Sequence, residues 1–315
     1  SRFSQLALAA SNMAIEDSEL EINDENRKNI SIVIGVSVNG VEIIEREVNI
    51  LNKKGVRKMS PFGVAGAIPN AAAQNIAIYN KIKGRVITIS TGCSSTLNAL
   101  GYAYELIKYN KSDIVISGGT EAPITPSVLG AFCAADVLSK ENYEPEKASR
   151  PFDKKRDGYV LGEGTAIFVL ESFENAIKRN AKIYGEIIGF ANFSDSYSLH
   201  KVSNTEEQLA ETMFNAMVDA GVKKREIEYI NAHGSSSYIG DIKETRAIKK
   251  IFDDYSYRLK ISSIKSTIGH PLGASGGMQV AASILAGYNG YILSLIHISE
   301  PTRPLYISYA VFCLK

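Results

Sequence analysis

Cys93 is the residue whose type and surroundings most favour covalent chemistry. It lies in the small-residue turn Gly92-Cys93-Ser94-Ser95, between a β-branched run at 85–91 and the helical pattern that follows. A cysteine in such a turn stands at a helix N-terminus, where the partial positive charge of unpaired N–H groups favours thiolate over thiol. Its small neighbours leave room for a substrate carbonyl to reach the sulfur and nearby backbone N–H groups. A buried structural cysteine is the alternative, and the turn by itself does not decide between the two.

Two of the four histidines follow expected strands. His233 comes after the run 227–231, and His270 comes after the run 259–262 and before a helical pattern. Ligands of α/β proteins bind at the carboxyl ends of strands, so both positions favour a site. A loop or helix-capping role is the alternative for His270, and His200 in its polar loop is typical of a solvated side chain. One nucleophile with two strand-end histidines is more informative than any one of the three.

Three sequence blocks resemble the signature blocks of β-ketoacyl-acyl-carrier-protein synthases. They are STGCSS around Cys93, NAHGSSSYIGD around His233 and KSTIGHPLGASGG around His270. The blocks SGGTEA at 117–122 and ASRPFDKKRDGYVLGEG at 148–164 match the same family. The resemblance runs in unbroken order from residue 1 to about 291 and is closest to the elongating condensing enzymes of fatty-acid and polyketide pathways. Three ordered blocks are a far more specific signal than a single glycine motif.

The resemblance implies a decarboxylative Claisen condensation and gives each matching residue a role. Cys93 would accept an acyl group from a carrier thioester, which suits a strongly nucleophilic thiolate. His233 and His270 would promote decarboxylation of a malonyl-type extender and stabilise the enolate that forms. Lys265, five residues before His270, would tune the electrostatics of the histidine pair.

The resemblance also predicts the partners. No cofactor or metal ion is expected, because the substrates arrive on the phosphopantetheine arm of acyl carrier protein. Ser235 and Ser237 stand where the family usually has threonines that hydrogen-bond this arm, so the hydroxyls remain. The cations at 154–156 would dock the acidic carrier, and a solvated charge run is their alternative. We expect a homodimer, or a heterodimer with a related subunit, that pairs strand 113–117 or its neighbour across a two-fold axis.

The sequence departs from the family pattern in the second half. Gln279 stands nine residues past His270, where the family often has a glutamate paired with the lysine. The glycine- and phenylalanine-rich ending, which supplies an oxyanion N–H and a gating phenylalanine, is missing, as is the first core strand before Ser1. Residues 292–315 lack any regular period and resemble a translated sequencing adapter, so we predict a non-native tail and discount His297 and Cys313. We therefore expect the chain as written to be poorly soluble and nearly inactive.

Alternating strand and helix patterns must position these residues. Strands are expected at 32–36, 85–91, 113–117, 165–170, 183–193, 227–231 and 259–262. Helices are expected at 1–17, 70–79, after 95, and at 173–179, 208–220, 244–252 and 276–285. This alternation predicts an α/β layered fold with mainly parallel strands. The resemblance makes it a thiolase-like five-layered αβαβα fold of two similar halves, with Cys93 in 1–175, both histidines in 176–291 and the site at their interface.

Composition excludes several other classes of protein. The 315 residues are 45% hydrophobic and 22% charged, enough to build a sizeable core. With 35 Lys and Arg against 34 Asp and Glu, the net charge of +1 argues against a nucleic-acid-binding protein. Three scattered cysteines form neither a disulfide framework nor a CxxC pair, which favours a reducing cytoplasm. No run of 18 apolar residues or signal peptide is present, so no membrane association is expected.

Three other functions remain possible on these residues. A non-condensing partner subunit of the chain-length-factor type would shape a pocket, but such subunits typically replace the cysteine found here as Cys93. A carrier-docking scaffold would need no nucleophile at all. A cysteine hydrolase with one Cys–His pair would leave Lys265 and the second histidine without a role.

Overall fold

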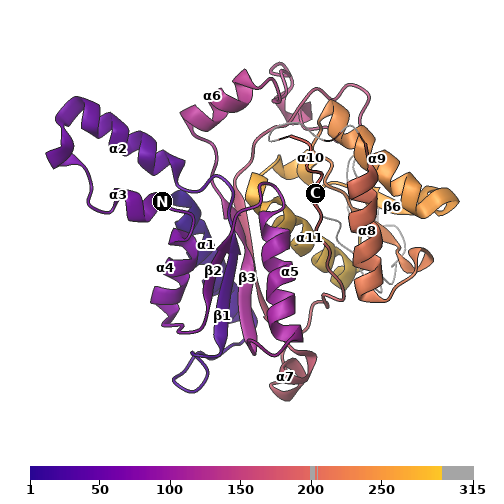
Figure 1. The fold of residues 1–315 in the computed structure, drawn as a ribbon, viewed down its shortest axis with the longest axis horizontal. Helices are drawn as coiled ribbons and strands as arrows, with labels where there is room; N and C mark the ends of the chain where they lie inside the picture. The colour runs from indigo at the N-terminus through magenta and orange to yellow at the C-terminus, as the bar shows by residue number, and fades with distance from the viewer. Residues whose placement is uncertain (199–202, 204, 293–315) are drawn as a thin grey trace. The chain divides into compact units, whose positions relative to one another are not determined.

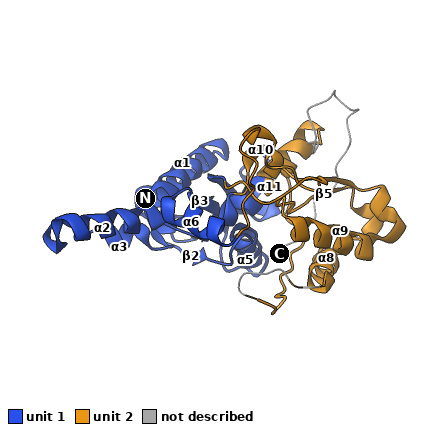
Figure 2. Cartoon of the chain, turned by 90° about the horizontal axis from the view of Figure 1, so that it is seen from above, with its two compact units in different colours: residues 1–135, 162–183, 271–278 blue, residues 136–161, 184–270, 279–315 orange. Residues whose placement is uncertain are grey.

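The computed structural model describes residues 1–198, 203 and 205–292 (Figure 1). His200 and the predicted tail from residue 293 onward, with His297 and Cys313, lie outside the described residues. The chain forms two compact units, which are blue and orange in Figure 2. Unit 1 contains residues 1–135, 162–183 and 271–278, and unit 2 contains 136–161, 184–270 and the residues from 279 onward.

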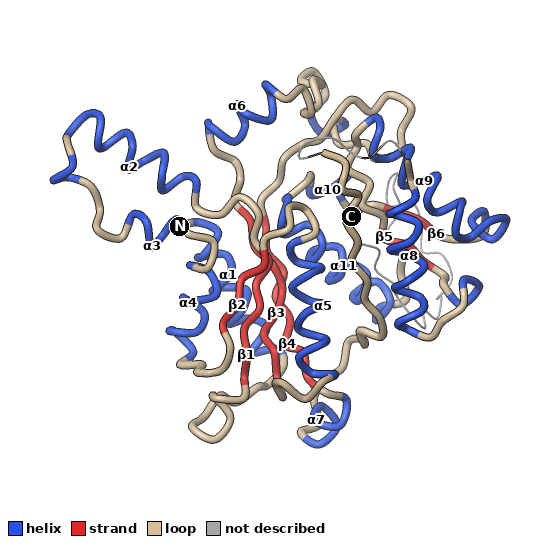
Figure 3. Tube along the Cα trace, viewed as in Figure 1, coloured by secondary structure: helices blue, strands red, loops and turns tan. Residues whose placement is uncertain are grey.

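Unit 1 is built on a four-stranded sheet, shown red in Figure 3. Its strand order is β2-β1-β3-β4, with β1 at Ile30–Gly35, β2 at Val86–Ile89, β3 at Ile114–Glu121 and β4 at Gly164–Glu171. β1 runs parallel to both β2 and β3, while β4 pairs antiparallel with β3. The prediction of mainly parallel strands is therefore confirmed for the strands around the nucleophile turn, and β4 is the antiparallel exception.

Helices cover both faces of this sheet (Figure 1). The helices of unit 1 are α1 at Arg2–Asp17, α2 at Val41–Lys54, α3 at Gly63–Ala67, α4 at Ala71–Asn80, α5 at Ser95–Lys108, α6 at Pro126–Ala134 and α7 at Phe173–Lys178. Ile32 and Ile34 of β1 pack in one cluster with α1 and α4, whereas Val33 packs in another with α5. Because successive side chains of a strand point to opposite faces, a continuous apolar run is needed to bury both.

Unit 2 holds a short parallel pair of strands, β5 at Tyr229–Asn231 and β6 at Lys260–Ser262. Its helices are α8 at Glu207–Ala220, α9 at Tyr238–Phe252, α10 at Lys265–Ile268 and the part of α11 (Ser275–Asn289) that follows residue 278. Across the two units, short 3-10 helices lie at Val56–Lys58 (η1), Pro145–Lys147 (η2), Lys224–Glu226 (η3), Asp253–Tyr257 (η4) and Leu272–Ala274 (η5). A core of α8, α9 and strand residues includes Met213, Ala247 and Ile230.

One predicted strand and several helix boundaries are wrong. The segment 183–193 is irregular, and within the described residues it forms no ladder with another strand. The backbone N–H of Phe190 instead donates to the Asp219 carboxylate of α8 at 2.9 Å. Apolar β-branched residues favour extended backbone, but a strand also needs a neighbour to accept its hydrogen bonds. Helices α2, α3, α6 and α10 were not predicted, and α9 starts six residues earlier than the expected helix at 244–252.

Helix length and polarity also bear on membranes. Among the described residues, no helix is long and apolar enough to cross a membrane.

Candidate active site

Cys93 lies in a tight turn between β2 and α5, as the sequence predicts. Gly92 adopts a positive φ of 64°, and α5 starts two residues after the cysteine. The Ser95 hydroxyl donates to the Gly92 carbonyl at 2.6 Å and accepts the Thr91 N–H at 2.9 Å. The Ser94 hydroxyl donates to the Thr91 carbonyl at 2.8 Å. These bonds hold the half-buried thiol at the N-terminal end of a fourteen-residue helix.

Two strand glycines let this helix approach the sheet backbone. Gly35 of β1 and Gly119 of β3 are register partners. A Cβ atom on Gly35 would lie 2.4 Å from the Ser95 carbonyl carbon, and one on Gly119 would lie 1.8 Å from the Thr96 hydroxyl oxygen. Glycine inside a strand commonly marks such a close approach of another backbone. The glycine that interrupts the apolar run of β1 therefore positions the nucleophile turn.

In unit 2, His233 and His270 lie together. Their ring centroids are 5.2 Å apart, with the planes at 85°. His233 follows β5 and is half-buried, whereas His270 follows α10 and is buried. The His270 N–H donates to the Val160 carbonyl at 2.7 Å, and the Tyr159 ring packs against the His270 ring at 5.3 Å. Two segments distant in sequence thus present paired imidazoles, which can donate two hydrogen bonds to one developing oxyanion.

Lys265 acts on the backbone of His233. The residue is 1% exposed, and its ammonium donates to the His233 carbonyl at 2.6 Å and to the Gln279 side-chain oxygen at 3.0 Å. The other end of the Gln279 amide donates to the Ala232 carbonyl at 2.6 Å and to the Asn231 carbonyl at 3.2 Å. Gln279 therefore does what a glutamate could not, because it accepts from the lysine and donates to the end of β5.

Glu244 of α9 is a functional candidate that the sequence did not reveal. Its carboxylate accepts the N–H of His233 at 2.6 Å and the N–H of Gly234 at 2.8 Å. Burial raises the pKa of Glu244, and these two hydrogen bonds and the charge of Lys265 oppose that rise. The His233 main chain is thus held by a buried anion at its N–H and a buried cation at its carbonyl. An acidic residue nearly two turns into the helix after a strand-end histidine was the available signal.

Ser235 and Ser237 lie in the loop between β5 and α9. Ser235 is buried, and its hydroxyl donates to the Ser237 hydroxyl at 3.0 Å. Ser237 is half-buried and directly precedes α9. Between them, the hydroxyl of Ser236 accepts the Arg150 N–H at 3.1 Å. The two hydroxyls are therefore adjacent, and the Ser237 hydroxyl retains a proton to donate.

The prediction that Arg156 docks the carrier is wrong, although Lys154 and Lys155 beside it are exposed. Its side chain is 8% exposed and lies 3.5 Å from the Asp241 carboxylate. The guanidinium also donates to the Ser237 carbonyl at 3.0 Å and to the Tyr238 carbonyl at 2.6 Å. A guanidinium with five donors satisfies several acceptors at once, so this cation supports the start of α9.

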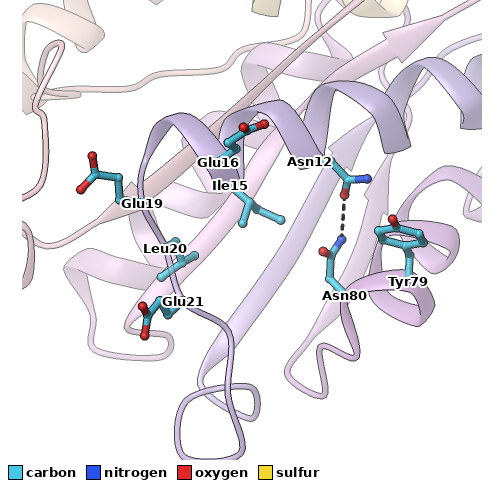
Figure 4. Close-up of a pocket in the computed structure, with 8 residues that line it drawn as sticks. All are labelled: Asn12, Ile15, Glu16, Glu19, Leu20, Glu21, Tyr79 and Asn80. Carbon is cyan, nitrogen blue, oxygen red and sulfur yellow. Dashed lines mark hydrogen bonds between the residues drawn. The ribbon is translucent and has the colours of Figure 1, made fainter.

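A surface hollow of about 470 Å³ lies in unit 1 (Figure 4). It is lined by α1, the residues after α1 and the end of α4, where Asn80 donates to Asn12 at 3.3 Å. None of the predicted site residues lines it, so it is not the candidate active site. Within the part of the chain that the structure describes, no cluster of three His, Cys, Asp or Glu residues could hold a metal ion.

Similar proteins place the chain in a family. The model of the N-terminal domain of β-ketoacyl synthase matches residues 1–176, and the model of the C-terminal domain matches residues 184–299. A 3-oxoacyl-[acyl-carrier-protein] synthase 2 of Coxiella burnetii is 44% identical over 299 residues, 95% of this chain and 72% of the relative. The Vibrio cholerae protein of the same name is 40% identical over 304 residues, 96% of this chain and 73% of the relative.

A solved structure extends this similarity to the fold. A type II PKS acyl-carrier protein in complex with its ketosynthase bound to the hexaketide has a TM-score of 0.88 and 30% identity, over 99% of this chain and 78% of that one. The similarity confirms the predicted thiolase-like α/β class. The curated relatives are acyltransferases of the condensing class, consistent with the blocks around Cys93, His233 and His270. The chain belongs to the β-ketoacyl synthase family.

Proposed function

We propose that this β-ketoacyl synthase carries its growing acyl chain on Cys93 and uses His233 and His270 to decarboxylate a malonyl-type extender. The observation that carries the proposal is the paired imidazoles, 5.2 Å apart, with the His233 main chain held by Lys265 and Glu244. A structural histidine would not need a buried ammonium and a buried carboxylate on its own peptide groups. The cost of burying two charges is consistent with a positioning role.

Acyl transfer to Cys93 is the first step. The thiolate attacks the carbonyl of the acyl-carrier thioester, the bond from that carbon to Sγ forms, and the bond to the phosphopantetheine sulfur breaks. The departing thiolate takes a proton from solvent. Helix α5 begins two residues after Cys93, and the partial positive charge of a helix N-terminus favours the anionic form of the sulfur.

Decarboxylation and condensation form the second step. The carboxylate of the extender leaves as CO₂, and its electron pair becomes the enolate of the remaining thioester. Neutral imidazoles of His233 and His270 donate hydrogen bonds to the enolate oxygen. The enolate carbon attacks the acyl carbonyl, a carbon–carbon bond forms, and Cys93 leaves as thiolate. Lys265 stabilises this charge distribution through the His233 carbonyl.

We further propose the partners and the organisation of the protein. Acyl carrier protein supplies both substrates on its phosphopantetheine arm, which the hydroxyls of Ser235 and Ser237 bind, and no resident cofactor takes part. Two copies associate through β2, because β2 is an edge of the described sheet while both edges of β3 are paired. The chain is organised as two thiolase-like halves that meet near residue 175, with Cys93 and the histidine pair acting on one thioester.

Labelled acyl transfer tests the nucleophile. In a protein with a restored full-length ending, Cys93→Ala should abolish single-turnover transfer of a radiolabelled acyl group from acyl carrier protein to the enzyme. Malonyl decarboxylation should persist, because the histidines remain. Cys133→Ala is the matched control, since Cys133 is an exposed thiol in α6. It should keep full labelling. Label retained by the Cys93→Ala protein would show that another residue carries the acyl group.

A further inference from the structure

Glu121, the last residue of β3, is a fully buried carboxylate that the proposed chemistry does not use. Oε2 accepts the N–H of Ser37 at 2.8 Å and that of Gly273 at 3.1 Å. Oε1 accepts the N–H of Val38 at 3.0 Å and that of Asn39 at 3.1 Å. Among the described residues, no charged side chain forms a hydrogen bond or ion pair with it. Four peptide dipoles from two chain segments therefore compensate this carboxylate.

These contacts lie at the edge of the sheet that carries the nucleophile turn. β1, β2 and β3 run parallel, so their carboxyl ends share one edge. The segment 37–39 follows β1, the Cys93 turn follows β2, and Glu121 ends β3. Glu121 thus joins two strand ends next to the turn that holds Cys93.

Gly273 is held from two sides at this edge. Its N–H donates to Glu121, and its carbonyl accepts the hydroxyl of Thr96, which lies three residues after Cys93. A Cβ atom on Gly273 would lie 2.6 Å from Glu121 Oε2, so only glycine allows the approach. Leu272 beside it has a φ of 36°, a strained conformation for leucine that the surrounding contacts must maintain.

We propose that Glu121 and Thr96 form a clasp on Gly273 that fixes the chain leaving His270 and so positions this histidine for decarboxylation. His270 precedes Gly273 by three residues, and its own N–H is bonded to Val160. With both ends of so short a segment fixed, little backbone freedom remains for the imidazole. Glu121 is a positioning residue, since it does not touch the reacting atoms, and its role rests on the proposed function.

The charge of Glu121 gives the clasp a distinct signature. Burial raises the pKa of Glu121 to about 7, while the four N–H donors hold it from rising further. Each oxygen already accepts two N–H groups, so a proton on either oxygen displaces one of them. The clasp is complete in the ionised state, and its contribution to the rate increases as pH rises through about 7.

Hydrogen exchange and pH profiles of variants test the clasp. Glu121→Gln should raise the amide exchange of the peptide covering 270–278 by about tenfold, because the fixed ends are released. It should lower kcat for decarboxylation about tenfold at about pH 8.5 and less than about twofold at about pH 6, with KM for the malonyl carrier unchanged. Thr96→Val should raise the same exchange, whereas Thr96→Ser keeps the hydroxyl and should behave like wild type.

Glu47→Gln is the matched control, because Glu47 of α2 is another buried carboxylate that accepts a backbone N–H, from Ser60 at 2.8 Å. Its pKa is lowered, so it carries its charge throughout this pH range. It should leave the exchange of 270–278 and the shape of the pH profile unchanged. Equal ratios of wild-type to Glu121→Gln rate at both pH values would overturn the proposal. Identical amide exchange of 270–278 in Thr96→Val and Thr96→Ser would also overturn the proposal. This second comparison tests the clasp even if the Glu121→Gln protein does not fold. A wild-type protein with a restored full-length ending that still takes no acyl label refutes the proposed function. The exchange result then judges the clasp by itself.

Discussion

The turn that carries Cys93 and the loops that carry the two histidines are held by different kinds of contact. Around Cys93, small side chains, serine hydroxyls and two strand glycines bring backbone against backbone. Around His233, a buried ammonium, a buried carboxylate and an amide bind the main chain. The first region should therefore be sensitive to side-chain volume and the second to side-chain charge.

Adding a methyl group to Gly35 should produce the largest loss of stability. A Cβ atom there would lie 2.4 Å from backbone atoms of both Ser95 and Thr96, and backbone cannot move aside as a flexible side chain can. We expect Gly35→Ala to lower the free energy of unfolding by about 4 kcal/mol or to prevent folding. Chemical denaturation followed by circular dichroism measures the change.

Gly130→Ala provides the matched control in the same unit. Gly130 lies inside α6, and nothing lies within 4 Å of its built Cβ atom. Because alanine is a better helix former than glycine, this variant should gain up to about 1 kcal/mol. Equal stability of the two variants would mean that α5 does not rest on the β1 backbone as described.

Removing the charge of Lys265 should affect the reaction more than the fold. Lys265→Met takes away the donor to the His233 carbonyl. It also removes the positive charge that lowers the pKa of Glu244 against the raising effect of burial. We expect malonyl decarboxylation to fall about 100-fold, since His233 loses its fixed orientation. Release of labelled CO₂ from malonyl carrier protein measures the rate.

Lys250→Met is the control for this charge, because Lys250 is an exposed residue of α9 that lies 3.8 Å from Glu207. Such surface ion pairs contribute little, so its rate should stay within about twofold of wild type. A Lys265→Met enzyme with normal CO₂ release would remove the charge-based account of the histidine region.

The same contrast explains what could be predicted from the sequence. The Cys93 turn follows from local order, since a β-branched strand, small residues and a helical pattern are consecutive in the chain. Glu121 and Glu244 could not be assigned in this way, because their roles depend on N–H groups brought to them by folding. Gly273 is 152 positions from Glu121, and only the folded chain places the two together. The prediction for Arg156 was wrong for a related reason. Three consecutive cations look like an exposed charged segment in the sequence, but the fold places the Asp241 carboxylate 3.5 Å from Arg156 and buries both side chains.

The prediction of a strand at 183–193 was wrong for a third physical reason. Its composition favours extended backbone, but a strand is completed by a partner, and partners are non-local. In the helices that were predicted correctly, such as α1 and α8, the period of apolar residues already encodes the buried face.

Gln279→Glu should give the smallest effect and is the sharpest test of charge in the histidine region. A glutamate would pair with the Lys265 ammonium, but its second oxygen would face the carbonyls of Ala232 and Asn231, which the Gln279 amide now serves. Neither carbonyl can donate, so the carboxylate loses two hydrogen bonds while it gains one ion pair. Because an unsatisfied buried acceptor costs about 1–3 kcal/mol, we expect a net loss of stability of about 1 kcal/mol and a few-fold lower decarboxylation rate. Denaturation midpoints of wild type and variant measure the balance. A more stable Gln279→Glu protein would show that the charge of Lys265 outweighs the hydrogen bonds at the end of β5, and that the amide is not adapted to this site.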